Sequence, residues 1–216
     1  MNMKKRMLSI VLSGAMAVST AVSAGSFSAF AVAQCVAYSG SNVNDQDYVQ
    51  WSDTVKSYLT VCDNGNYMRV QSGAIKGKLL VEYYSSDFEP LSTKLIDNEL
   101  PIFGAFYDSG NNYYVLSGQE NPKQNDSLEV FRITKYDKNW NKIKSCGLYG
   151  ANTTVPFDAG SARMTHSGDH LLVRTCHKMY KSSDGNNHQA NVTIEVDMPS
   201  MTITDSYTGI MNVDYG

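Results

Sequence analysis

Residues 105–115 read AFYDSGNNYYV, and this stretch decides the fold. Two short apolar runs flank a polar turn in which a glycine stands beside asparagine. Glycine adopts the positive φ that tight hairpin turns require, and asparagine tolerates it better than most residues. The stretch therefore predicts two antiparallel strands joined by a hairpin.

The same frame recurs on either side of this stretch, as TVCDNGNYMRV at residues 60–70 and RMTHSGDHLLV at residues 163–173. The turn glycines Gly65, Gly110 and Gly168 lie 45 and then 58 residues apart. Self-similarity at such a period is typical of repeat architectures, in which each repeat is one supersecondary unit.

A second predicted hairpin follows each of these three. Residues 79–84 turn through SSDFEP into 91–96, residues 128–136 turn through DKNWN into 142–146, and residues 192–196 turn through DMPS into 201–204. A unit of four antiparallel strands at this period is typical of a β-propeller blade. Chance alignment of glycine turns is the alternative, but two turn types recur in the same order and favour blades.

We therefore expect an all-β chain, a partial β-propeller with blades at about residues 58–96, 103–146 and 160–204. Propellers close with about four to eight blades, so three leave the ring open. Three explanations remain: a fragment whose C-terminal blades are missing, pairing with copies of itself, or an open sandwich. The fragment is favoured, and residues 34–57, including Trp51, are interpreted as an incomplete blade or a closing strand.

The first 33 residues have the pattern of a cleaved secretory signal. Three basic residues (Lys4, Lys5, Arg6) precede 18 mostly apolar or small residues, and small residues then stand at signal-peptidase spacing up to Ala33. A membrane anchor, the alternative, needs ~20 strongly apolar residues, and here serines and a threonine dilute the run. The sequence predicts a signal peptide at 1–33 and a secreted or cell-surface domain at 34–216, with no membrane segment after cleavage.

Cleavage makes the chain more acidic. The whole chain has 18 Lys and Arg against 21 Asp and Glu, and the three charges of the signal are basic. The mature chain keeps 15 basic residues and a net charge of −6. An acidic surface without a basic cluster repels phosphate backbones, which excludes nucleic acid as the expected partner.

Four cysteines, Cys35, Cys62, Cys146 and Cys176, lie in the exported part, where disulfides form. Four cysteines permit three pairings, and the sequence leaves all of them open beside the alternative of buried free thiols. No two are spaced as a C-x-x-C redox or zinc motif.

All four histidines lie within 23 residues, from His166 to His188. If the loop after His177 is a hairpin centred near Ser182, His177 and His188 face each other at the end of the blade that also carries Asp158 and Asp184. Imidazoles and carboxylates together bind divalent metals, so His177 and His188 are the metal candidates. The alternative is exposed histidines bonded to nearby backbone, because the spacing matches no named metal motif.

Arg163 and Arg174 are expected on inner strands of the third blade, where a guanidinium binds an anionic group in bidentate fashion. An ordinary ion pair is the alternative. Cys176 and His177 are adjacent on one strand and so point to opposite faces, which argues against a nucleophile–base pair. The ligand-binding candidates are therefore Asp158, Arg163, Arg174, His177, Asp184 and His188, and no catalytic set or cofactor is assigned.

Residues 156–165, PFDAGSARMT, and the segments RTCHKMY at 174–180 and DGNNHQAN at 184–191 carry a resemblance. There the chain resembles uncharacterised secreted bacterial β-propeller proteins of Gram-positive type, over about residues 60–216. The resemblance implies the fold and an extracellular location more than an activity. In those proteins the propeller continues beyond the equivalent of Gly216.

Two classes of function follow. The first is a secreted or cell-surface module that binds a carbohydrate or a protein, which rests on export, the repeats and the absence of a catalytic signature. The second is an extracellular hydrolase, lyase or sulfotransferase that uses the His177 and His188 face, which rests on the clustering of the histidines.

Overall fold

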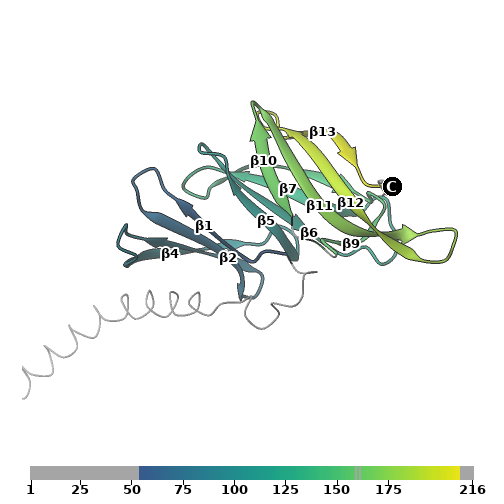
Figure 1. Ribbon diagram of the computed structural model, residues 1–216, viewed down its shortest axis with the longest axis horizontal. Coiled ribbons are helices and arrows are strands. Elements are labelled where there is room, and N and C mark those ends of the chain that lie inside the picture. The colour runs from purple at the N-terminus through teal and green to yellow at the C-terminus, as the bar shows by residue number, and fades with distance from the viewer. Residues whose placement is uncertain (1–53, 159, 161, 210–216) are drawn as a thin grey trace, which may run out of the picture.

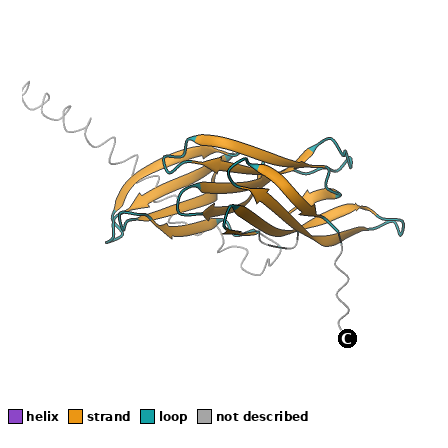
Figure 2. Ribbon diagram, turned by 90° about the horizontal axis from the view of Figure 1, so that it is seen from above, coloured by secondary structure: helices purple, strands orange, loops and turns teal. Residues whose placement is uncertain are grey.

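The computed structural model describes residues 54–158, 160 and 162–209, so the expected signal peptide and residues 34–53 lie outside the described part. Within that part the chain forms strands and turns and no helix (Figure 2). The strands form three antiparallel sheets, which follow one another along the molecule from the first to the third (Figure 1).

Each sheet is built from consecutive strands in chain order. The first contains β1 (Ser57–Val61), β2 (Tyr67–Ile75), β3 (Lys78–Tyr84) and β4 (Pro90–Asp97). The second contains β5 (Ile102–Asp108), β6 (Tyr113–Gly118), β7 (Glu129–Tyr136) and β8 (Lys142–Tyr149). The third contains β10 (Arg163–Ser167), β11 (His170–Lys181), β12 (Asn187–Asp197) and β13 (Thr202–Tyr207), with β9 (Thr153–Pro156) paired to β11.

This architecture confirms the predicted fold class. Each sheet has the four-stranded antiparallel meander of a propeller blade, and the described residues form a partial β-propeller. The predicted glycine turns also occur, since Gly110, between β5 and β6, has a φ of 90°. None of the described residues belongs to a helix able to cross a membrane.

The turn between the third and fourth strands of each blade repeats a feature that the sequence did not predict. Phe88, Trp140 and Met201, all large and apolar, adopt positive φ values of 64°, 64° and 49° in these turns. Such a conformation is uncommon outside glycine and asparagine. A polar side chain at the head of each turn compensates: Asp137 Oδ1, for example, accepts hydrogen bonds from two backbone N–H groups of its turn.

Two apolar cores lie between successive sheets. Between the first and second sheets, Val70 and Val81 pack with Phe106, Val115 and Trp140. The alternation of β2 and β3 puts these valines on one face, as the period of a strand requires.

The second core lies between the second and third sheets, where Leu116 and Ile133 pack against Leu171, Val173 and Ile194. All five are fully buried. Burying an aliphatic side chain stabilises the fold by roughly 1.5–3 kcal/mol, so these two cores fix how the blades stack.

The short strand β9 differs from the expected simple link between blades. It pairs with the far half of β11, where Pro156 lies opposite His177 and Val155 opposite Lys178. Strand β11 is 12 residues long, so it extends past β10 and has an edge free for β9. The link after the second blade is therefore held rigidly against the third.

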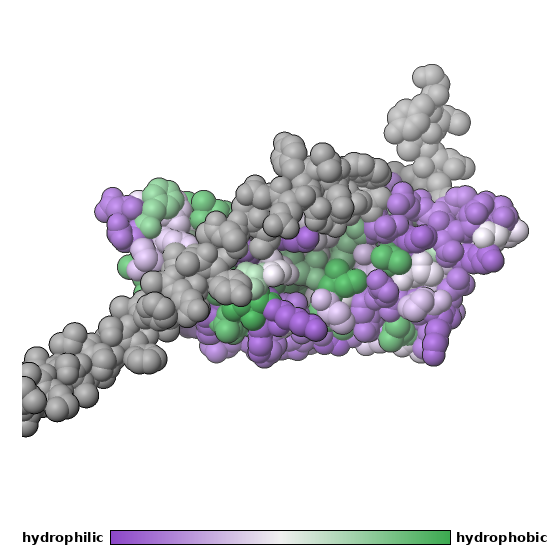
Figure 3. Space-filling model, turned by 90° about the horizontal axis from the view of Figure 1, so that it is seen from below, coloured by the Kyte–Doolittle hydropathy of each residue, from purple (hydrophilic) through white to green (hydrophobic). Residues whose placement is uncertain are grey.

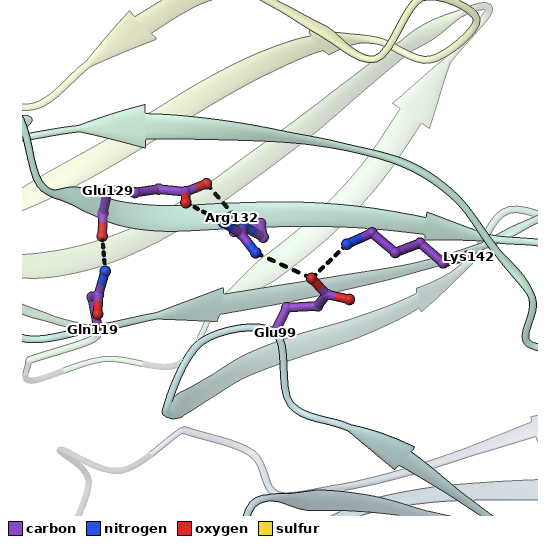
Figure 4. Close-up of polar contacts among 5 residues, drawn as sticks. All are labelled: Glu99, Gln119, Glu129, Arg132 and Lys142. Carbon is purple, nitrogen blue, oxygen red and sulfur yellow. Dashed lines mark hydrogen bonds and ion pairs between the residues drawn. The ribbon is translucent and has the colours of Figure 1, made fainter.

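A cluster of charges ties the connection between the first two sheets to the second sheet (Figure 4). Arg132 Nε donates to Glu129 Oε1 at 2.9 Å, and its NH1 donates to Glu99 Oε2 at 3.1 Å. Lys142 Nζ donates to the same Glu99 oxygen at 2.6 Å. The hydrogen bond with Glu129 is the main cause that raises the pKa of Arg132. Two carboxylates neutralise two cations in this cluster, so we assign it a structural role.

The two outermost faces of the described sheets differ in character. The outer face of the first sheet exposes Leu59, Val61 and Leu95, each about half or more accessible. Figure 3 shows hydrophobic residues at this end of the molecule and a mostly hydrophilic surface at the other end, where β11 and β12 lie. The outer face of the third sheet is mostly polar.

Candidate functional site

A polar cleft of about 290 Å³ lies between the second and third sheets, at the end where their first hairpins turn. The β5–β6 turn contributes Asn111 and Asn112, and the β10–β11 turn contributes Asp169. Both turns exist because glycine at positive φ reverses the chain there, as in Gly168 with a φ of 55°. The repeated hairpins thus place two polar turns side by side at the opening of the cleft.

Tyr114, on β6, lies at the base of this cleft and is fully buried. Its hydroxyl has no hydrogen-bond partner among the described residues. Burial, with a smaller contribution from the charge of Asp169, raises the pKa of Tyr114 to about 12. A buried hydroxyl left without a partner costs about 1–3 kcal/mol. Because Tyr114 is 0% accessible, a ligand in the cleft reaches this hydroxyl only after the side chains over it move aside.

Lys135, on β7, supplies the cationic side of the cleft. Its ammonium lies 5.9 Å from the centroid of the Tyr114 ring, and it donates a hydrogen bond of 3.0 Å to the carbonyl oxygen of Met198. That bond fixes the side chain against the β12–β13 turn and leaves two ammonium hydrogens for other acceptors.

His166, on β10, forms the inner wall. Its Nδ1 and the Tyr107 hydroxyl are 2.7 Å apart, in hydrogen-bonding distance, and the two rings meet edge to face. Tyr107 belongs to β5, so this pair connects the first strands of two neighbouring blades. The cleft therefore combines a cation, a carboxylate, an imidazole, amides and a buried hydroxyl.

These groups suit recognition of a polar molecule. Amides, hydroxyls and charged groups beside an aromatic ring provide both donors and acceptors at fixed positions. Among the described residues, no three His, Cys, Asp or Glu side chains are grouped so that they could hold a metal ion.

The face chosen from the sequence lies at the opposite ends of the strands. Asp158 does lie beside the β11–β12 hairpin, because Gln189 Nε2 donates to its Oδ2 at 3.0 Å. A smaller hollow of about 220 Å³ is present at this end, lined by Thr154, Lys178 and Asn187 among others.

The prediction that His177 and His188 face each other is wrong. His177 pairs with Ala190, since the turn of the hairpin runs from Ser182 to Asn186 and a bulge follows Lys178. The hairpin is therefore centred about two residues later than expected, and the register shifts accordingly.

The two rings also differ in environment. His177 is fully buried, its Nδ1 lies 2.6 Å from Thr153 Oγ1, and burial lowers its pKa to about 4. His188 is half-buried, and its Nε2 lies 2.7 Å from Asp184 Oδ2. The structure thus brings Asp184 to His188 but does not join either to His177.

Arg163 and Arg174 are both exposed and lie directly opposite each other on β10 and β11. Cys176 points to the same side, where its thiol contacts Asn191 Oδ1 at 3.6 Å. The expectation that Cys176 and His177 point to opposite faces is therefore confirmed.

The three cysteines of the described residues, Cys62, Cys146 and Cys176, are free thiols, and Cys35 lies outside that part. Burial raises the pKa of Cys146 to about 11, which makes its thiolate scarce at neutral pH.

Sequence reasoning missed the cleft. His166 and His170 flank the first hairpin turn of the third blade, which is a usable signal in the sequence. It did not indicate that Tyr114 and Lys135 of the second blade would lie beneath the same turn, because that contact depends on how two sheets pack.

No protein-family model matches the sequence, and no curated protein matches it. Among solved structures, a mutant of Synechocystis apocarotenoid oxygenase is similar with a TM-score of 0.48 and 10% identity, over 71% of this chain and 38% of that one. A GH43 β-1,3-galactosidase with galactodeoxynojirimycin is similar with a TM-score of 0.36 and 12% identity, over 69% of this chain and 44% of that one. The chain thus spans less than half the length of either structure, and likenesses this weak support no conclusion about activity.

Proposed function

We propose that this chain is an exported β-propeller module that binds a hydroxyl-rich ligand, a sugar, in the cleft between its second and third sheets. The buried hydroxyl of Tyr114 carries the proposal. Tyr114 lines a polar cleft and its hydroxyl has no hydrogen-bond partner among the described residues, so a ligand hydroxyl that bonded it would remove an existing cost.

The composition of the cleft supports a sugar over an apolar ligand. Asn111, Asn112 and Asp169 offer amide and carboxylate groups at its mouth, and Lys135 offers an ammonium below them. A sugar ring carries several hydroxyls, and each can donate and accept a hydrogen bond. A sugar can therefore bond both the acceptors and the donors of the cleft. Loops positioned by a rigid scaffold commonly carry binding, and both turns of the cleft belong to such loops.

Binding is favoured over catalysis by the placement of the histidines. The enzyme alternative needs His177 and His188 in one site, yet His177 is fully buried beside Thr153 and the half-buried His188 lies beside Asp184. Within the described residues, these two rings do not lie in one site where both could contact the same substrate.

Export is part of the proposal and rests on residues 1–33. Deleting these residues should retain the protein in the cytoplasm of a producing bacterium, whereas the full chain should appear outside it in a form about 33 residues shorter. Mass spectrometry of the mature N-terminus tests this, and an uncleaved, cell-retained full-length chain contradicts it.

The binding site itself is tested with a panel of oligosaccharides and two matched variants. Tyr114→Phe removes only the buried hydroxyl, and Tyr149→Phe removes a hydroxyl from a tyrosine that is 56% exposed on β8. We expect a sugar from the panel to raise the melting temperature of the wild type. The same sugar should bind the Tyr114→Phe variant about tenfold more weakly than the wild type, which corresponds to the loss of one hydrogen bond of ~1.4 kcal/mol. Tyr149→Phe should bind as the wild type does.

The same variant separates binding from folding. Because the Tyr114 hydroxyl is buried without a partner, Tyr114→Phe should leave the free energy of unfolding unchanged or raise it. A sugar that binds both variants equally well, or a panel in which no sugar binds, contradicts the proposal.

A further inference from the structure

Four side chains form one row across the outer face of the third sheet. The register places Arg163 opposite Arg174, Arg174 opposite Thr193, and Thr193 opposite Tyr207. Directly opposed residues of antiparallel strands point to the same face. With strands ~4.8 Å apart, the row crosses β10, β11, β12 and β13 over ~14 Å.

The two arginines of this row have no acidic partner among the described residues. Arg163 NH1 donates to the carbonyl oxygen of Ala162 at 3.1 Å, and Arg174 NH1 donates to Thr193 Oγ1 at 2.6 Å. Glu195, two residues after Thr193 on the same face of β12, lies 2.7 Å from His170 Nδ1 instead.

Other arginines of the described chain are paired. Arg132 contacts Glu129 and Glu99, and Arg69 lies 3.9 Å from Glu82. Arginine stays protonated in proteins, and like charges directly opposite on neighbouring strands destabilise a sheet. Two arginines that lie opposite each other on β10 and β11 without an acidic partner among the described residues, on an acidic chain, therefore form a local site that attracts an anion.

The face around the row is suited to a ligand in solution. Both arginines are exposed, and the Tyr207 ring is 45% accessible at the other end of the row. The bond to Thr193 holds the Arg174 guanidinium in place, and its remaining N–H groups are free to form a bidentate contact.

We propose that this row binds an acidic polysaccharide, with a carboxylate or sulfate group held between Arg163 and Arg174. The neighbouring sugar then lies along Thr193 toward the ring of Tyr207. The proposal does not depend on the cleft, because the cleft lies on the inner side of the third sheet and the row lies on its outer side.

A sugar chain fits this row better than an acidic peptide. Peptides commonly bind a sheet at its edge, where main-chain groups are available for an added strand. The row crosses the face of the sheet from the edge strand β10 to the edge strand β13, and on that face it offers side chains and not main-chain groups. Guanidinium, hydroxyl and aromatic groups are the kind that recognise charged and uncharged parts of a sugar.

The test compares dextran sulfate with unmodified dextran, which share a backbone and differ in sulfate. The assay uses the mature protein at 150 mM salt, where long-range attraction between exposed charges is largely screened. Under these conditions we expect the protein to bind dextran sulfate and not dextran. The double variant Arg163→Gln/Arg174→Gln should bind dextran sulfate at least tenfold more weakly.

A control of equal charge change is Lys76→Gln/Lys123→Gln, at two exposed turn positions outside the row. It should bind dextran sulfate within about twofold of the wild type. Equal losses in both double variants mean attraction by net charge alone and overturn the proposal, as does an unchanged affinity in the arginine variant. Binding of polyglutamate as tightly as dextran sulfate also overturns it, in favour of an acidic peptide.

Folding gives a second readout. Removing both of two facing like charges should not lower the melting temperature, so the double arginine variant stays folded and the binding comparison stays valid. Dextran sulfate should raise the melting temperature of the wild type and not that of the arginine variant. An equal rise in both contradicts the proposed site.

Discussion

The hydroxyl of Tyr107 and Nδ1 of His166 lie 2.7 Å apart, so one hydrogen bond joins the first strands of two successive blades. The residues are 59 positions apart in sequence. Beside this bond the buried hydroxyl of Tyr114 lines a polar cleft. The junction between blades, and not a single blade, thus produces the candidate site.

Tyr107→Phe should weaken this junction. Loss of one hydrogen bond near the surface is expected to lower the free energy of unfolding by about 0.5–1.5 kcal/mol. Urea unfolding measures the change, with the exposed Tyr149→Phe as the control that should stay within about 0.5 kcal/mol of the wild type. Equal effects of the two substitutions contradict a role for the contact.

His177 should make stability depend on pH. Its pKa is lowered from 6.5 to about 4 by burial, so the unfolded chain binds this proton at a higher pH than the folded chain does. The contribution is fully present above pH ~6.5 and is lost as the pH falls toward ~4, on the order of 2–3 kcal/mol.

Unfolding by urea between pH 4 and 7 measures that contribution. His177→Gln should flatten the slope of stability against pH in this window, whatever its effect at pH 7. His188→Gln, at a histidine whose side chain is 40% accessible, should leave the slope closer to that of the wild type. A slope that His177→Gln does not alter contradicts the burial argument.

Gly147→Ala should disrupt the charge cluster on the second sheet. A Cβ at this position would stand 1.9 Å from Glu129 Oε1, so the carboxylate would have to leave its place beside Arg132. We expect a loss of about 1–3 kcal/mol in the free energy of unfolding. In a Glu129→Ala background the same substitution should cost much less, because the obstructing group is gone. Additive effects of the two substitutions contradict this reason.

Trp140→Ala should lower the free energy of unfolding strongly. Phe88→Ala, at the equivalent turn position of the first blade, should lower it only slightly. Trp140 is almost fully buried against Phe106 and Tyr113, and its Nε1 donates to the Tyr83 hydroxyl at 3.1 Å. Removing it should cost about 3–5 kcal/mol. Phe88 is 61% exposed, so its removal should cost about 1 kcal/mol or less by the same unfolding assay. Similar costs at both positions contradict the difference in packing.

The fold was predictable because its signals are local. Strand alternation and the glycine turns at Gly65, Gly110 and Gly168 depend only on neighbouring residues, and these three glycines indeed have positive φ. The positive φ of Phe88, Trp140 and Met201 was not predictable, since side-chain bonds at the head of each turn and the packing of the large residue impose it.

The candidate site was harder to predict for a related reason. The register of the β11–β12 hairpin depends on a bulge after Lys178, which the sequence does not reveal, so the facing of His177 and His188 was misjudged. Arg163 and Arg174 were expected on inner strands of the third blade, but their direct opposition depends on the register of β10 and β11, and their lack of acidic partners depends on where Glu195 points. Tyr114 and His166 come together only through the stacking of two sheets.

The most direct measurement is a crystal structure of the mature protein with the sugar that most raises its melting temperature. Our account predicts a sugar hydroxyl within ~3 Å of the Tyr114 hydroxyl, with Asn112, Lys135 or Asp169 bonded to the same molecule. A sugar bound elsewhere, with the cleft empty and the Tyr114 hydroxyl still without a partner, would contradict the account.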